Sequence, residues 1–124
     1  MHKIGLLLVC ASCLTLAIGC GDDSEEEGEV GELPEVDCSG DVPKYAEVTA
    51  FEVCANCHSS TKSGADRNSA PPEDNFDTYA SAEKGATEAV EEVFGGDMPP
   101  AGTFTLTEDQ KQQLYLWALC GAQE

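Results

Sequence analysis

The stretch CANCH, residues 54–58, places two cysteines and a histidine within five residues of one another. On a helix, residues three and four positions apart share a face, so Cys54, Cys57 and His58 would project to the same side within one turn. The chain has only 124 residues, with one tryptophan and four phenylalanines. So small a core is marginally stable by apolar burial alone, and it needs a disulfide, a metal or a cofactor at its centre. The motif marks where such a group would attach.

Three chemistries compete for this motif. The spacing C-x-x-C-H fits c-type haem attachment, in which two thiols bond covalently to the porphyrin and the adjacent histidine ligates the iron. A zinc site would add a fourth ligand, either Cys38 or Cys120, but zinc ligands more often lie at least two residues apart. A redox-active dithiol of Cys54 and Cys57 usually accompanies a βαβ pattern, which this sequence lacks. The spacing therefore favours haem over zinc and over the dithiol.

Residues 1–19 differ sharply in composition from the rest of the chain and are predicted to be a removable signal peptide. After a short basic start, the apolar run 4–19 has sixteen residues, fewer than the ~20 that a membrane-spanning helix needs. The run ends in LAIGC, which resembles a bacterial lipoprotein signal, with Gly19 just before Cys20. Lipidation of Cys20 would hold the protein at a membrane surface without a spanning helix. An ordinary signal peptide cut nearby is the alternative.

The segment 20–37 begins with Cys20 and continues as an acidic stretch with no basic and no aromatic residue. It cannot bury enough apolar surface to fold, so it is predicted to be a disordered tether. Removal of residues 1–19 takes away only one basic residue and leaves five basic and 24 acidic side chains, a formal charge of −19. This charge excludes nucleic acid as a partner, because binding the phosphate backbone requires Lys and Arg. It favours docking on a basic protein surface, although it also suits a solvated surface without a partner.

Residues 38–124 are predicted to form one domain of 87 residues. Its apolar residues recur at helical spacing in three stretches, 45–58, 76–94 and 107–121, and no strand-like alternation of useful length is present. A polar, proline-containing loop, 59–74, separates the first two stretches. The pattern therefore predicts an all-α fold.

Helix boundaries are indicated by glycines and by one capping box. Gly85 predicts a break within the second stretch, and the glycine pair at 95–96 predicts its end. The third stretch opens with Thr107 and Gln110 at capping-box spacing and ends at Gly121. These signals divide the domain into three or four short helices.

From CANCH through GDMPP to LYLWALCG, residues 54–121 resemble a small class I cytochrome c, here carried on a lipoprotein anchor. The resemblance implies a cytochrome c-like fold of three to four short helices around one covalently attached haem c. It implies that Cys54 and Cys57 carry the haem thioethers, that His58 is the proximal iron ligand and that Met98 is the distal ligand. No other histidine or methionine occurs after the signal segment.

Met98 lies in the sequence GGDMPP. A lone methionine is usually core filler. However, Pro99 disfavours helical geometry at the residue before it, and Pro100 stiffens the chain immediately after it. A methionine on a stiff extended loop is poorly placed as helix core and well placed to reach a metal.

The resemblance also implies a haem environment. The family keeps a proline whose carbonyl accepts the proton of the ligating imidazole, near the position of Pro71 and Pro72 in this chain, and such an acceptor fixes the ring. Arg67 and Tyr79 would bond the haem propionates. Each residue has an ordinary alternative: a loop terminator for the prolines, the surface for Arg67 and the core for Tyr79.

With residues 1–19 removed, two cysteines remain after lipidation of Cys20 and haem attachment at Cys54 and Cys57. In an oxidising compartment, this even remainder favours a disulfide between Cys38 and Cys120, which flank the domain. The alternative is two free buried thiols.

The leading hypothesis is a membrane-anchored monohaem electron carrier that faces the periplasm of a bacterium, and not an enzyme. Gly21 gives no clear retention signal, which favours the outer over the inner membrane. Its partners would be redox proteins with a basic docking surface, and the membrane through the lipid. A haem-based redox or gas sensor with a displaceable Met98 is one alternative. A structural or interaction module stapled by zinc is another.

Overall fold

Four α-helices and two short 3-10 helices make up the regular structure of residues 33–124, the part of the chain that the computed structural model describes. The elements in chain order are η1 (Tyr45–Glu47), α1 (Ala50–Cys54), η2 (Gly64–Arg67), α2 (Tyr79–Lys84), α3 (Ala86–Gly95) and α4 (Glu108–Leu119). This part contains no β-strand, which confirms the predicted all-α class. The predicted signal peptide and Cys20 lie outside the described residues. Within residues 33–124, no helix is long and apolar enough to cross a membrane.

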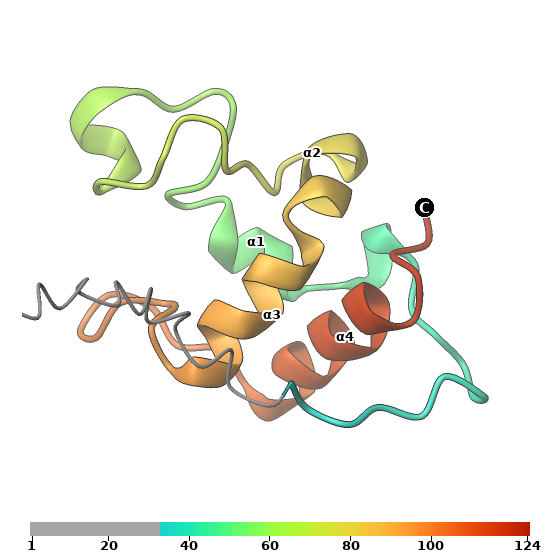
Figure 1. Ribbon diagram of the computed structural model, residues 1–124. Helices are drawn as coiled ribbons and strands as arrows, with labels where there is room; N and C mark the ends of the chain where they lie inside the picture. Colours follow the sequence, from blue (N-terminus) through green and yellow to red (C-terminus); the bar gives the residue numbers. More distant parts are fainter. Residues whose placement is uncertain (1–32) are drawn as a thin grey trace, which may run out of the picture.

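Helices α3 and α4 pack against each other and form the centre of the domain, with α1 beside them (Figure 1). Gly85 separates α2 from α3, as predicted, and a Cβ built at this position would lie about 3.5 Å from the Phe76 ring, in ordinary van der Waals contact. Helix α3 ends at Gly95, and Gly96 has a left-handed φ of 89°, a conformation that glycine adopts without steric cost. The predicted break and end of this stretch are both confirmed.

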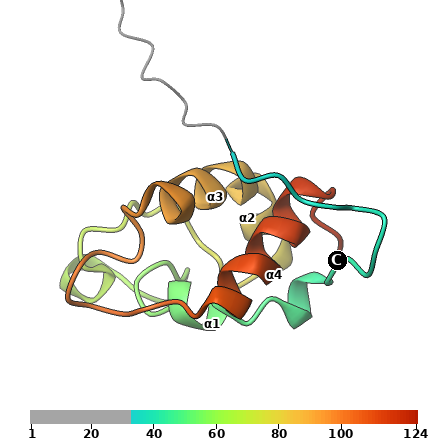
Figure 2. The same cartoon turned by 90° about the horizontal axis from the view of Figure 1, so that it is seen from below.

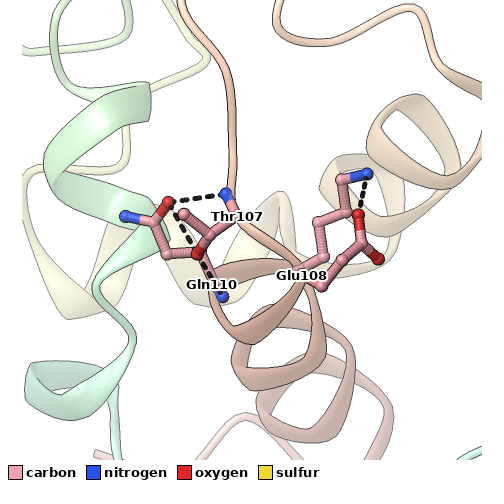
Figure 3. Close-up of polar contacts among 4 residues, drawn as sticks. Thr107, Glu108 and Gln110 are labelled. Carbon is pink, nitrogen blue, oxygen red and sulfur yellow. Dashed lines mark hydrogen bonds and ion pairs between the residues drawn. The ribbon is translucent and has the colours of Figure 1, made fainter.

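Helix α4 begins with the predicted capping box (Figure 3). The Gln110 backbone N–H donates to the Thr107 hydroxyl at 3.2 Å, and the Thr107 N–H donates to the Gln110 side-chain oxygen at 2.9 Å. Two of the free N–H groups at the start of the helix are thereby satisfied.

An aromatic cluster forms the core between α1, α4 and the segment before α2. Phe51 of α1 meets Trp117 of α4 edge to face, with ring centroids 5.0 Å apart, and stacks on Phe76 at 5.7 Å. Tyr45 stacks on Phe51 and donates its hydroxyl to the Phe76 carbonyl at 2.8 Å. The Trp117 indole N–H donates to the Gln123 carbonyl at 2.7 Å, so this buried polar group is satisfied.

Helix α1 has only five residues and is held in place by α4. The side-chain oxygen of Gln113 accepts hydrogen bonds from the Thr49 backbone N–H at 3.1 Å and from the Thr49 hydroxyl at 2.9 Å. Thr49 is the residue that precedes α1. Isolated helices this short are not stable in water. The position of α1 therefore depends on α4 and on the aromatic cluster.

A disulfide joins Cys38 to Cys120, with Cα atoms 5.5 Å apart, and confirms the predicted bridge. It ties the chain that precedes η1 to the end of α4, and the two views show this segment running beside α4 (Figures 1 and 2). The described residues 33–37, which the sequence assigned to the tether, pack Leu33 and Val36 against the core. These two apolar side chains, three positions apart, extend the packed region to before Cys38.

Candidate functional site

A mostly apolar cavity of about 230 Å³ lies between the CANCH turn, α3 and the loop that connects α3 to α4. Cys54, Cys57, His58 and Met98 all line it. Much of the remaining wall is apolar, including Phe76, Ala89, Val93, Phe104 and Leu106. The residues that the sequence selected as thioether and iron ligands, which come from distant segments of the chain, thus share one cavity.

Three side chains of CANCH, those of Cys54, Cys57 and His58, face the cavity because the chain keeps turning after α1 ends. The His58 N–H donates to the Cys54 carbonyl at 2.8 Å and the Cys57 N–H to the same oxygen at 3.1 Å. The Asn56 amide closes the end of α1 by donating to the carbonyls of Glu52 and Val53. The sequence predicted a helix through residue 58, whereas α1 ends at Cys54 and continues as turns that preserve the expected common side.

The His58 ring is oriented by a backbone carbonyl. Its Nδ1 lies 3.1 Å from the carbonyl oxygen of Asp74, and its ring meets Phe76 edge to face at 5.4 Å. A carbonyl oxygen can only accept, so this hydrogen bond requires the proton on Nδ1. In that tautomer, Nε2 carries the free lone pair with which a histidine ligates a metal.

The environment of the two thiols disfavours the dithiol interpretation. Cys54 and Cys57 are both unbridged. Burial raises the pKa of the Cys54 thiol to about 11. Redox-active cysteines are activated by a lowered pKa, because the thiolate is the reactive form. At neutral pH, Cys54 is a protonated thiol in an apolar wall, the opposite of an activated nucleophile.

Met98 is fixed in the loop after α3 by that helix's own end. The Met98 and Asp97 N–H groups both donate to the Glu92 carbonyl, at 3.0 and 2.9 Å. The methionine is half-buried and packs against the core. Met98 is not part of a helix, as the two following prolines predicted.

Arg67 was expected beside the propionates, but the cavity is lined without it. Its side chain is 5 % exposed and is directed into the loop 59–76. Each of its five N–H donors has an acceptor within that loop. These acceptors are the carbonyls of Ala70, Ser59, Pro71 and Asp74 and the side-chain oxygen of Asn75. Arg67 therefore organises the backbone behind the cavity.

Pro71 and Tyr79 also differ from the sequence expectation. Pro71 lines the cavity, but its carbonyl accepts from Arg67, and the carbonyl facing His58 is that of Asp74, three residues later. Tyr79 lies away from the cavity wall and donates its hydroxyl to Glu83 at 3.1 Å, one turn further along α2. Side-chain spacing cannot reveal which backbone carbonyl turns inward, so the sequence could not single out Asp74.

A zinc site finds little support in this geometry. Among residues 33–124, no group of three or more His, Cys, Asp and Glu side chains could hold a metal ion. Cys38 and Cys120, the proposed sources of a fourth ligand, are bonded to each other.

Asp77 is a site-supporting residue that the sequence analysis missed. One of its carboxylate oxygens accepts from the Ser59 hydroxyl at 3.0 Å, the Ser60 hydroxyl at 2.7 Å and the Ser60 N–H at 3.0 Å. Hydrogen bonds, chiefly from the Ser60 hydroxyl, hold the pKa of Asp77 below its ordinary value of 3.8. The two serines directly after His58 indicated that a hydrogen-bond acceptor should lie nearby. The sequence did not indicate which carboxylate it would be.

Comparisons of the chain with protein-family models, with curated proteins and with solved structures found no match. The chemistry of the site is therefore argued from its own residues.

Proposed function

We propose that this protein is a monohaem c-type cytochrome that carries single electrons between partner proteins in a bacterial cell envelope. The observation that carries the proposal is the shared cavity wall of Cys54, Cys57, His58 and Met98. Two thiols, an imidazole and a thioether in an apolar cavity are the donor set of covalent attachment with two axial ligands. A haem c bound there would supply a one-electron iron couple.

Each residue has a defined task in this proposal. The Cys54 and Cys57 thiols would each add S–H across a vinyl double bond, forming an S–C bond while the hydrogen moves to the neighbouring carbon, with no net oxidation. Asp74 holds the proton on His58 Nδ1, which leaves Nε2 to ligate. The apolar walls exclude water and, with the Met98 thioether, favour a raised reduction potential.

Electron transfer is favoured over catalysis because Met98 would fill the position at which a substrate could bind. One electron would enter from a reduced partner protein and leave to an oxidised one, with no bond made or broken. The formal charge of −18 for the whole chain favours partners with a basic docking surface. A lipid on Cys20 would keep the carrier at the membrane.

The test is expression of the full chain in a bacterial periplasm with and without cytochrome c maturation machinery. With the machinery, we expect a red protein with the visible bands of low-spin haem c and colour that stays with the polypeptide on a denaturing gel. The double variant Cys54→Ser with Cys57→Ser is the matched control and should lose the covalent colour. A colourless wild-type protein from cells that contain the maturation machinery, with or without stoichiometric zinc, would overturn the proposal.

Carbon monoxide distinguishes the carrier from the sensor. If Met98 holds its position, the reduced protein at neutral pH keeps its spectrum under carbon monoxide. Rapid spectral change on exposure to the gas would instead favour a sensor with a displaceable methionine.

A further inference from the structure

Arg67 is a buried cation that has no neutralising carboxylate among residues 33–124. Its side chain is 5 % exposed, and its partners are four backbone carbonyls and one amide oxygen. Within residues 33–124, the ion pair found is Lys111 with Glu108, on α4. Arginine stays protonated in proteins, so this positive charge is permanent. Buried charges are usually paired, and a buried cation that is not paired invites a functional explanation.

One backbone oxygen, that of Asp74, is bonded both to the Arg67 guanidinium and to the His58 ring at the cavity. Arg67 Nη2 donates to the Asp74 carbonyl at 3.0 Å, and His58 Nδ1 lies 3.1 Å from the same oxygen. The carbonyl that orients the imidazole is therefore also bonded to a cation. Hydrogen bonds to the far nitrogen of a ligating histidine raise its basicity, and an oxygen shared with a guanidinium has less electron density to give.

We propose that Arg67 is a positioning residue that raises the reduction potential of the site through the Asp74 carbonyl and through its own buried charge. The inference rests on the proposed function. Removal of an electron from a metal bound at His58 adds one positive charge to the site, and a buried cation nearby opposes that step. A less basic imidazole also stabilises the oxidised metal less. Both effects act in the same direction and favour the reduced form.

Three variants that each lower the net charge by one test this inference. Arg67→Gln removes the cation. Asn75→Asp leaves Arg67 in place and puts a carboxylate where Arg67 Nη1 now donates to the Asn75 side-chain oxygen at 2.9 Å, so it neutralises the cation without removing its hydrogen bonds. Gln112→Glu makes the same charge change at an exposed position on α4, away from the cavity wall. A fourth variant, Arg67→Lys, keeps the charge but loses the five-donor fork.

The measurement is the midpoint potential of each purified holoprotein by spectroelectrochemistry, with thermal unfolding recorded in parallel. For Arg67→Gln and Asn75→Asp, we expect the ratio of oxidised to reduced protein at a fixed potential to rise about tenfold, which is ~59 mV for a one-electron couple. Gln112→Glu should stay at the wild-type potential. Arg67→Lys should lose thermal stability but keep most of the potential.

Two results would overturn the inference. One is a wild-type potential in both Arg67→Gln and Asn75→Asp, which would leave Arg67 with a purely structural role in the loop. The other is an equal fall in all three charge-lowering variants, which would indicate a general effect of net charge. If Arg67→Gln does not mature, Asn75→Asp decides the question alone. Failure of the proposed function is separate, since it appears as wild-type protein without covalent haem.

Discussion

Met98 lies at the cavity wall in the loop between α3 and α4, and its position is fixed by the end of α3. Under the proposed haem ligation, we expect Met98→Ala to keep covalent haem, because both thiols are unchanged, but to leave the iron without its sixth ligand. The visible spectrum should shift from low to high spin, the potential should fall and carbon monoxide should bind. Phe104→Ala, which alters the same cavity without removing a ligand, is the control. An unchanged spectrum in Met98→Ala would show that the sixth ligand is another group.

Asp77 gives the protein a stability that depends on pH. Its pKa is lowered on folding, so its ionised form stabilises the folded state above pH 3.8, and this contribution is lost as the pH falls through the lower folded value. We expect Asp77→Asn to be less stable than wild type in urea at pH 7, with the difference shrinking as the pH falls below 3.8. Asp41→Asn, which removes an exposed carboxylate, should show no such pattern. A pH-independent difference between Asp77→Asn and wild type would contradict this account.

At the residue scale, the sequence predicted which side chains line the cavity better than it predicted which backbone carbonyl faces His58. CANCH was recognised by its motif spacing, and Met98 was selected because no other methionine follows the signal segment. The acceptor for His58 was missed because carbonyls leave no sequence signal, and nothing in the sequence around Asp74 sets it apart. Arg67 was expected to bond the haem propionates because its side chain is a cation and they are anions. Its observed partners are instead oxygens of carbonyl groups, among them that of Asp74.

At the scale of elements, α4 organises the domain, since it carries Trp117, supports α1 through Gln113 and ends at the disulfide. Its start depends on the capping box at Thr107 (Figure 3). We expect Thr107→Ala to lower the free energy of unfolding by about 1 kcal/mol, as loss of an N-cap typically does. Chemical denaturation of the holoprotein measures it. The neighbouring exposed Thr105→Ala is the control, and equal losses in both variants would argue against a capping contribution.

Helices with strong end signals were predicted well, and the weakly marked ones were not. The left-handed Gly96 and the Thr107 capping box are local signals, and Gly85 lies at the junction of α2 and α3, so the boundaries of α3 and α4 were predicted correctly. Helix α1 is shorter than its apolar spacing predicted. It is held in place by contacts with α4 and not by the helix propensity of its own residues. The 3-10 helix η2 lies inside the predicted loop 59–74, and it depends on Arg67 bonds that no periodicity reveals.

At the scale of the whole molecule, the formal charge of −18 should control encounter rates. We expect oxidation of the reduced protein by the cationic tris(phenanthroline)cobalt(III) to slow several-fold as salt rises from about 10 mM to about 0.5 M, because salt screens the attraction. Oxidation by anionic ferricyanide should accelerate over the same range. Stopped-flow absorbance measures both, and each oxidant is compared only with itself, so their different potentials cancel. Oxidation rates that do not change with salt concentration for either oxidant would contradict electrostatic steering.

The disulfide closes nearly the whole domain, because Cys38 and Cys120 are 82 residues apart in sequence. On the chain-entropy estimate, a loop of this size contributes ~4.5 kcal/mol, less any strain in the folded state. A double variant, Cys38→Ser with Cys120→Ser, is therefore expected to lose about 2–5 kcal/mol of unfolding free energy in denaturant. Its midpoint potential should stay near wild type, since neither sulfur lines the cavity. A large change in potential without a loss of stability would mean that the bridge shapes the site directly, against the separation of roles argued from this fold.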